Sequence, residues 1–143
     1  MSSSWDPDDS ILDTGPASIR EAIGKEAEDQ IVTSRDPGRE GLPGRRMPEG
    51  FAQKLQAVAL PGNMLVFETK FGRDKTLPSH SHAGVDIFRI VIEGSIEYEG
   101  TRLGPGDWMF VPSGSDYELS SGKDGATICH MYIRPNPPGP GPR

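Results

Sequence analysis

The chain has 143 residues, the length of a single domain, and it carries 15 Lys and Arg against 21 Asp and Glu, for a formal net charge of −6. This acidic balance argues against a nucleic-acid partner and against an anionic membrane surface, because both select for an excess of basic side chains. The 18 Gly and 14 Pro are a density of helix breakers that excludes a helical bundle and favours a β-rich core.

Residues 1–50 are predicted to form a mostly irregular N-terminal arm. Residues 1–34 contain eight acidic and two basic residues, so the acidity of the chain is concentrated there. A capping-box pattern predicts a short helix over residues 18–30. Residues 35–50 contain three Pro and four Gly and are predicted to be a loop.

Residues 51–134 have the pattern of a β-barrel domain. We expect strands at residues 53–59, 64–71, 86–93, 95–99, 108–112 and 127–133, where short runs are rich in β-branched and aromatic residues. Turn residues such as Glu93-Gly94 separate these runs. The pattern predicts an all-β fold, a small antiparallel barrel or jelly roll. Residues 135–143 hold five prolines and are predicted to be an extended or disordered tail.

Two of the three histidines form the sequence His80-Ser81-His82. Alternate residues of a strand share a face, so both imidazoles can reach one point. The pair follows a turn-like segment, residues 73–78, and precedes a long apolar strand. Imidazole nitrogen suits Zn, Cu, Fe and Ni, and His80 and His82 are therefore candidate metal ligands.

The sequence around this pair resembles the two motifs of the cupin family. The first family motif is a glycine, an HxH pair, three or four residues, an acid, six residues and a glycine. The second is a glycine, five residues, P-x-G, two residues and a histidine. The corresponding segments here are HSHAGVDIFRIVIEG, from His80 to Gly94, and GDWMFVPSGSDY, from Gly106 to Tyr117. The resemblance covers residues 51–134 of the chain.

The resemblance implies a small β-barrel, often a homodimer, with a divalent metal ion (Fe, Mn, Ni or Zn) at its centre. It also implies a small-molecule ligand or substrate, because members of the family include dioxygenases, isomerases, decarboxylases, cyclases, lyases and metal-free binders. The second motif ends here on Tyr117 where the family pattern expects histidine. A tyrosine in that position is expected to orient a ligand by a hydrogen bond or to act as an acid or base.

The strand after the histidines has two possible registers, which turn opposite sets of side chains inward. If even-numbered residues face inward, as the alternation along 86–92 favours, Asp86 lies near the metal and Arg89 forms an outward ion pair. If odd-numbered residues face inward, as the glycine spacing of the motif favours, Asp86 faces out unless a bulge intervenes. Arg89 would then lie in an apolar barrel and anchor a carboxylate, enolate or phosphate group.

The third histidine, His130, shares a strand face with Ile128 and Tyr132 if residues 127–133 form a strand. A lone histidine on an apolar strand is most simply a satisfied core residue. Because the second motif lacks its histidine, His130 is also a candidate third metal ligand. Cys129 points to the opposite face and is expected to be a buried small hydrophobe.

Cys129 is the single cysteine, so it has no partner for an internal disulfide. The start of the chain lacks the basic and apolar regions of a secretory signal, and no apolar run approaches the roughly 18 residues that a membrane-spanning helix needs. We therefore expect a reduced, cytoplasmic protein.

Two hypotheses of function follow. The first is a metal-dependent enzyme of oxygenase, isomerase, cyclase or lyase type that acts on a small molecule such as an anion or a carbonyl compound. Its metal ligands would be His80 and His82, completed by Asp86 or His130, and its catalytic residues would be Tyr117 and Arg89. The second is a metal-free or non-catalytic cupin that binds a small metabolite as a sensor or binding module.

Overall fold

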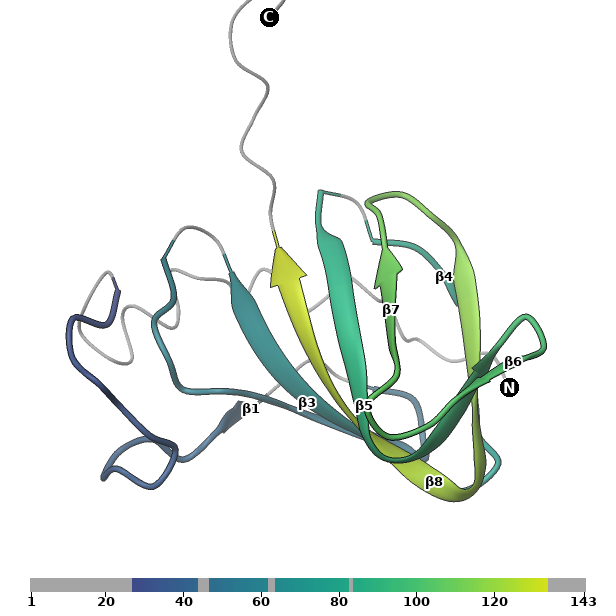
Figure 1. Ribbon diagram of the computed structural model, residues 1–143, viewed down its shortest axis with the longest axis horizontal. Helices are drawn as coiled ribbons and strands as arrows, with labels where there is room; N and C mark the ends of the chain where they lie inside the picture. Colours follow the sequence, from purple (N-terminus) through teal and green to yellow (C-terminus); the bar gives the residue numbers. More distant parts are fainter. Residues whose placement is uncertain (1–26, 44–46, 62–63, 83, 134–143) are drawn as a thin grey trace, which may run out of the picture.

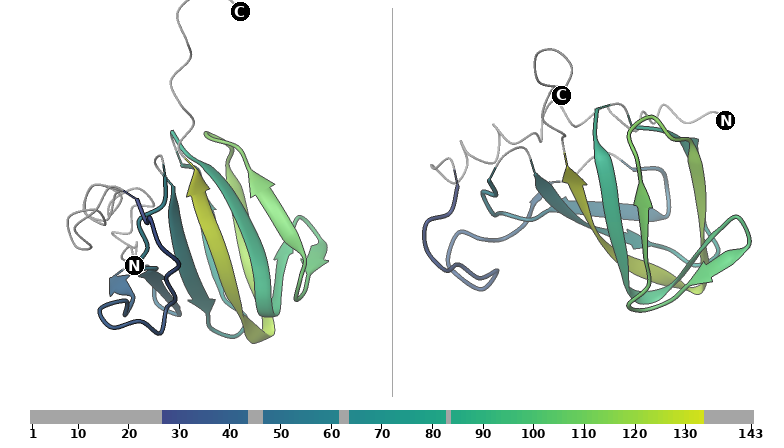
Figure 2. Two further views of the ribbon diagram at one scale, coloured as in Figure 1. Left: turned by 60° about the vertical axis from the view of Figure 1, so that its left-hand side comes forward. Right: turned by 45° about the horizontal axis from the view of Figure 1, so that its top comes forward.

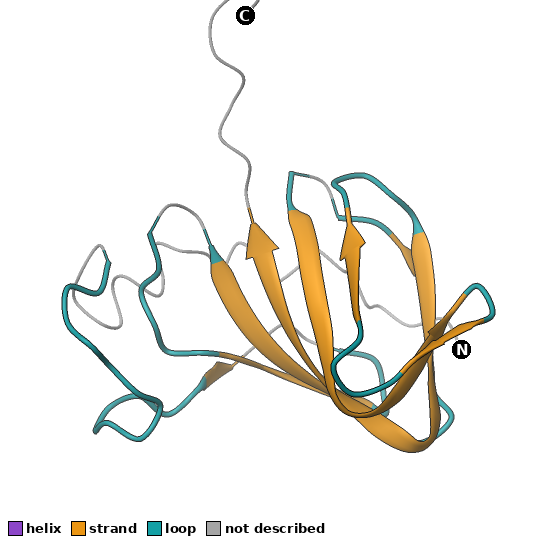
Figure 3. Ribbon diagram, in the orientation of Figure 1, coloured by secondary structure: helices purple, strands orange, loops and turns teal. Residues whose placement is uncertain are grey.

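A computed structural model describes residues 27–43, 47–61, 64–82 and 84–133 of the chain. These residues form eight strands and no helix (Figure 3). The strands are β1 (Leu42–Pro43), β2 (Phe51–Leu55), β3 (Leu65–Phe71), β4 (Thr76–His80), β5 (Asp86–Tyr98), β6 (Thr101–Leu103), β7 (Trp108–Val111) and β8 (Tyr117–Ile133). The prediction of an all-β antiparallel fold is confirmed.

Two long strands, β5 and β8, hold the molecule together. They pair with each other along most of their length, and both bend so that each belongs to two layers (Figure 1). The first layer consists of β2, β3, the end of β8, the start of β5, and β7. The second consists of β4, the start of β8, the end of β5, and β6. The views in Figure 2 show the layers as the walls of a cup.

The core lies between these layers, and the strand patterns explain it. Along β3, burial alternates strictly from Leu65 to Thr69, as period-two side-chain geometry requires. Phe67 and Tyr132 are the two largest fully buried side chains, and their rings lie 4.9 Å apart between centroids. Fully burying an aromatic or branched aliphatic side chain contributes about 1.5–3 kcal/mol, so this alternation provides the main stabilisation of the sheet.

The expected turn at Glu93-Gly94 is wrong, because β5 runs through it. Gly94 has φ of 72°, and the β5–β8 register shifts on both sides of it. A Cβ on Gly94 would overlap the carbonyl oxygen of Gly125. Gly94 therefore marks a β-bulge at which the backbones of β5 and β8 come close, rather than a hairpin. The hairpin follows at Glu99 and Gly100, which both have positive φ, as a type I′ turn requires.

The bulge resolves the question of register. Ile87 and Val91 belong to the hydrophobic core before it, with Arg89 buried between them, and Ile96 belongs to the core after it, while the buried Ser95 lies against Gly122. The inward face thus changes from odd to even residue numbers at the bulge. The register in which odd-numbered residues face inward is confirmed for residues 86–92. Ile96 faces inward from the same strand because it lies after the bulge.

Several other strands also differ from the expectation. β1 lies within the predicted loop of residues 35–50, and β4 occupies the second half of the segment 73–78 that is predicted to be turn-like. β4 contains Pro78, which has no N–H for a ladder, and this strand pairs on one side only, with β8. β8 begins ten residues before the strand expected at 127–133, because the GKDG segment at 122–125 resembles a turn but forms part of the bulge.

The described part of the N-terminal arm is anchored to the barrel. The Arg39 guanidinium donates to both carboxylate oxygens of Glu28, at 2.6 and 3.1 Å, and Glu28 Oε2 also accepts from the Ala59 amide at 3.1 Å. Most of the helix predicted over 18–30 lies outside the described residues, and residues 27–30 are irregular. The tail of residues 135–143 also lies outside them. Nowhere in the described ranges is there a helix long and apolar enough to cross a membrane.

Candidate functional site

Four polar side chains meet inside the barrel, and we call them the His–Tyr–Arg cluster: His80, His82, Arg89 and Tyr117. Their exposed fractions are 8%, 2%, 4% and 4%. β4 ends at His80, which is the register partner of Tyr117 at the start of β8. His82 follows β4, and Arg89 comes from the inward face of β5. The cluster thus joins residues from both layers.

The Tyr117 hydroxyl is the centre of this cluster. It lies 2.9 Å from His80 Nε2 and 3.3 Å from His82 Nε2. One guanidinium nitrogen of Arg89 donates to the same oxygen at 2.8 Å. The two imidazoles therefore reach one point, as expected, and the phenol oxygen of Tyr117 occupies that point.

With both imidazoles neutral, the hydrogen bonds permit one consistent set of protons. His80 Nδ1 lies 2.7 Å from the carbonyl oxygen of Pro78. A carbonyl only accepts, so Nδ1 carries the proton, and Nε2 of the neutral ring accepts. Tyr117 then donates its single proton to His80 Nε2. The lone pairs of the Tyr117 oxygen remain available to Arg89 and to His82 Nε2, so that this buried hydroxyl is fully used.

Arg89 is a buried cation that lacks a carboxylate partner. Neither ion pair found within the described ranges, Glu28–Arg39 and Glu68–Lys54, includes it. Its Nε atom is fully buried and has no hydrogen-bond partner among the described residues. Its guanidinium carbon lies 5.0 Å from the centroid of the Tyr117 ring. A buried charge compensated only by neutral groups is costly, so an anion beside Arg89 would be stabilised.

His130 belongs to a separate polar group on the inner face. It is the register partner of Arg89 on β8. Its Nε2 lies 3.4 Å from Gln53 Nε2, and its Nδ1 lies 3.5 Å from the Thr69 hydroxyl. Its ring stacks on Phe67 at a centroid distance of 5.4 Å. This placement matches the interpretation of His130 as a core histidine, and the structure does not bring it to the His80–His82 pair.

Asp86 is not brought to the cluster either. It is half-buried on the face of β5 opposite Arg89, and its carboxylate accepts a 2.9 Å hydrogen bond from the Ser113 amide. Asp86 therefore fixes the loop before β8 rather than facing the histidines.

The donor set suits an anion better than a metal ion. Within the described ranges, no group of three or more His, Cys, Asp or Glu side chains could hold a metal ion. The two imidazole nitrogens converge on a hydroxyl that already receives a guanidinium N–H. A divalent cation at that point would lie close to a fixed positive charge in a site shielded from water, where repulsion is strong. These residues therefore do not fit a divalent metal ion, but they do fit an anion.

A cavity of about 200 Å³ opens beside the cluster. Of the cluster, only Tyr117 lines this cavity, and Arg89 lies behind it, bonded to the Tyr117 hydroxyl. Met109, also in the lining, is the register partner of Arg89 on β7. Val111 adds apolar surface, and Asp116 is exposed at its rim. The volume is below the roughly 300–1,000 Å³ of pockets for drug-sized ligands, so the cavity suits a small ligand with an apolar body.

Sequence reasoning missed two polar residues of the inner face, Gln53 and Thr69. Their side chains are joined by a 3.1 Å hydrogen bond, and both approach His130. The alternation along 65–71 could have placed Thr69 on the buried face with Phe67. No local signal marks Gln53, because its role depends on the pairing of β2 with β3.

Comparison with known proteins identifies the fold. No protein-family model and no curated protein matches the sequence. Among solved structures, an RmlC-like cupin from Shewanella frigidimarina matches with a TM-score of 0.56 and 15% identity, over 78% of this chain and 96% of that one. The polyketide cyclase RemF from Streptomyces resistomycificus matches with a TM-score of 0.56 and 19% identity, over 78% and 83%. KdgF from Halomonas sp. matches with a TM-score of 0.54 and 22% identity, over 64% and 86%.

At these identities, the similarity shows the fold and not the reaction. The structural neighbours are cupin proteins, and the chain has a cupin-like fold, as its motifs indicated.

Proposed function

We propose that this protein binds a small monocarboxylate in the cavity beside the His–Tyr–Arg cluster, with Arg89 as the anchor and without a resident metal ion. The observation that carries the proposal is the burial of Arg89 with no carboxylate partner and with an unpaired Nε. Guanidinium groups bind carboxylates through two parallel hydrogen bonds. A carboxylate ligand would supply the missing acceptor and the missing negative charge.

The charge and lining of the site favour a monoanion with an apolar body. Arg89 is the one cation of the cluster, and its partner groups are neutral in the proton assignment above. A single negative charge balances it, whereas a dianionic phosphate would leave a second buried charge without compensation. Met109 and Val111 line the adjoining cavity and would contact the apolar part of the ligand.

A metal-dependent enzyme is the second candidate, and one observation favours it. The His80 Nδ1 proton is held by the Pro78 carbonyl, an arrangement that orients the opposite nitrogen toward a metal in many metal sites. His80 and His82 would be the ligands of such an ion. This candidate requires Tyr117 and Arg89 to accommodate a cation, and the donor set described above opposes that.

Calorimetric titration of chelator-treated protein tests the proposal. Benzoate and isobutyrate serve as probes, with benzamide and isobutyramide as uncharged counterparts. We expect the carboxylates to bind and the amides to bind far more weakly. In Arg89→Met, affinity for the carboxylates should fall by roughly 2–5 kcal/mol, the usual cost of removing one partner of a buried, hydrogen-bonded charge pair. The free energy of unfolding should hold or rise, because a buried charge is removed.

Lys70→Met is the matched control, since Lys70 is an exposed cation on β3 without an ion pair among the described residues. Its carboxylate affinity should equal that of the wild type. Equal binding by Arg89→Met and wild type would refute the anchor. Carboxylate binding that is absent in the chelator-treated protein and appears only when a divalent metal ion is added back would favour the metal-dependent candidate instead.

A further inference from the structure

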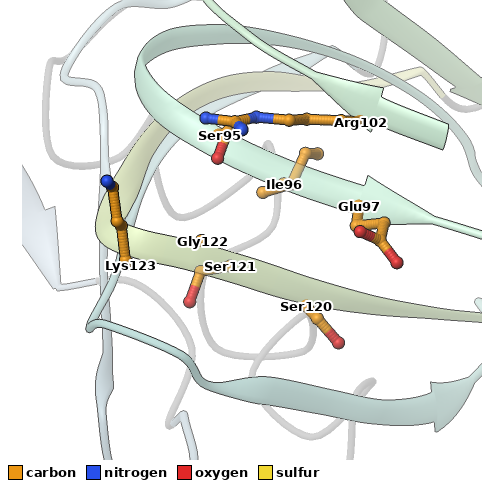
Figure 4. Close-up of a pocket in the computed structure, with 8 residues that line it drawn as sticks. All are labelled: Ser95, Ile96, Glu97, Arg102, Ser120, Ser121, Gly122 and Lys123. Atoms are coloured by element: carbon orange, nitrogen blue, oxygen red, sulfur yellow. The ribbon is translucent and has the colours of Figure 1, made fainter. Parts of the chain in front are cut away.

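A second cavity, of about 190 Å³, lies at the corner where β5 and β8 bend between layers (Figure 4). Its lining includes Ser95 and Glu97 of β5, Arg102 of β6, and Ser121 and Lys123 of β8. It shares no lining residue with the His–Tyr–Arg cluster or with the cavity beside it. A water molecule takes about 30 Å³ of liquid volume, so this cavity has room for an oxyanion with part of its hydration shell.

Two cations flank this corner cavity. Arg102 and Lys123 are both exposed, and neither takes part in an ion pair within the described ranges. Glu97 is the cross-strand register partner of Arg102 and would be its natural ion-pair partner. Figure 4 shows the Arg102 side chain extending away from Glu97, toward the end of the cavity where Ser95 lies. The charge of Arg102 is therefore directed at the cavity.

A buried hydroxyl supplies a donor at the same end. Ser95 is 6% exposed, and its hydroxyl makes no hydrogen bond to any described residue. The Ser95 oxygen is not among the fully enclosed unpaired atoms and Ser95 lines the cavity, so its hydroxyl is open to the cavity and can bond a water molecule or a ligand there. A Cβ on Gly122 would clash with the Ser95 Oγ, so the glycine leaves the space that this hydroxyl occupies.

Ser121, by contrast, is already engaged. Its hydroxyl donates to the Gly72 carbonyl at 2.6 Å and accepts from the Lys75 amide at 2.9 Å. Of the two serines that are buried in this lining, Ser95 is thus the one whose hydroxyl is available to a ligand.

We propose that this corner cavity is a binding site for a phosphate group. A fork-shaped guanidinium, an ammonium and a hydroxyl are the groups that bind phosphate oxygens. Two cations against the one carboxylate of Glu97, from which Arg102 extends away, favour a multiply charged oxyanion at the Arg102 end of the cavity. The single Arg89 of the interior site matches a monoanion. The site is open to solvent, so its affinity for phosphate is expected to fall as the salt concentration rises.

Amide NMR spectra of ¹⁵N-labelled full-length protein, titrated with inorganic phosphate at constant ionic strength, test this site. We expect saturable shifts at residues 95–97, 102 and 120–123. Arg102→Gln and Lys123→Gln should each weaken phosphate binding by roughly 1.5- to fivefold, the effect of an exposed charge pair, and the double variant should abolish saturation. Ser95→Ala should also weaken binding. Lys70→Gln, an exposed cation elsewhere, and Arg89→Met should leave it unchanged.

Acetate, titrated under the same conditions, should shift these residues more weakly than phosphate. Shifts that do not saturate, that centre on other residues, or that persist unchanged in the Arg102→Gln/Lys123→Gln variant would overturn the proposal. Equal affinities for acetate and phosphate would overturn the assignment of a dianion. The two proposals are tested by different variants, because Arg89→Met leaves the corner cavity intact. Loss of phosphate binding at the corner can therefore be distinguished from loss of carboxylate binding at the interior site.

Discussion

The Tyr117 hydroxyl is the shared hydrogen-bond partner of the other polar side chains in the His–Tyr–Arg cluster. It contacts His80, His82 and Arg89 at hydrogen-bond distance. Removal of this oxygen leaves an acceptor on His80 and a donor on Arg89 without their partner in a site shielded from water. An unsatisfied buried polar group costs about 1–3 kcal/mol, so the residue has a structural role that exists whether or not a ligand is bound.

Tyr117→Phe is therefore expected to lower the free energy of unfolding by about 1–3 kcal/mol, measured by urea denaturation. Tyr98→Phe is the matched control, because the Tyr98 hydroxyl has no hydrogen bond to a described residue, and it should stay within about 0.5 kcal/mol of the wild type. In Arg89→Met/Tyr117→Phe the loss should be smaller than the sum of the single effects, since Arg89 no longer needs the hydroxyl. Strict additivity would contradict the coupling.

Cys129 shows a second effect of burial on a single side chain. It lies half-buried, rather than fully buried as expected, on the outward face of β8, opposite Glu68 of β3 in the register. Burial raises the pKa of the Cys129 thiol, and the nearby charge of Glu68 raises this pKa further. Both effects disfavour the thiolate, which is the nucleophilic form.

The alkylation rate of Cys129 by iodoacetamide should consequently be slow at neutral pH and should rise with pH, with a midpoint above that of a free cysteine. Glu68→Gln removes the negative charge near the thiol and should lower the midpoint of this pH dependence. The alkylation rate at a given pH should therefore increase. Glu97→Gln, a charge change on another strand, should have no effect. A midpoint at or below that of free cysteine would contradict this interpretation of the environment.

At the scale of elements, the bend of β5 and β8 makes the cup and creates the corner cavity. Gly94 lies at this bend with positive φ and in close approach to Gly125. The bulge changes the parity of the inward face, so that Arg89 and Ile96 both face inward from one strand.

Gly94→Ala is expected to destabilise the fold by roughly 2–6 kcal/mol, the sum of the costs of overpacking and of a left-handed backbone for a residue with a Cβ. Gly104→Ala is the matched control, because its Cβ would meet nothing within 4 Å and its φ is not in the left-handed range. It should change the free energy of unfolding by less than about 0.5 kcal/mol. The free energy of unfolding of both variants is measured by thermal and urea denaturation. Similar values for Gly94→Ala and Gly104→Ala would contradict the role given to Gly94.

The strands that the sequence did not reveal share a physical reason. β4 contains Pro78 and β8 contains the segment 122–125, and both look like turns when only neighbouring residues are considered. Their pairing depends on a partner strand that is distant in sequence. The same holds for the bulge at Gly94, because a glycine after a glutamate is also typical of a hairpin, and only the approach of Gly125 distinguishes the two.

For the whole molecule, the motifs predicted the fold better than the site. The paired motifs indicated a cupin-like barrel, and the structure and its neighbours confirm it. His80, His82, Tyr117 and the inward Arg89 do meet, but Asp86 and His130 do not join them. Their positions follow from the parity of β5 and from the contacts of β8 with β2 and β3, which no short motif encodes. The homodimer and the cytoplasmic location stay predictions.

The central claim is that the interior site is built for an anion on Arg89 rather than for a metal ion on the histidines. Elemental analysis of protein purified without an affinity tag tests this most directly, with His80→Ala/His82→Ala as the comparison and circular dichroism to verify that the double variant folds. The account predicts a metal content well below one ion per chain, and the same in both proteins. A content near one ion per chain in the wild type that is lost in the folded double variant would contradict it.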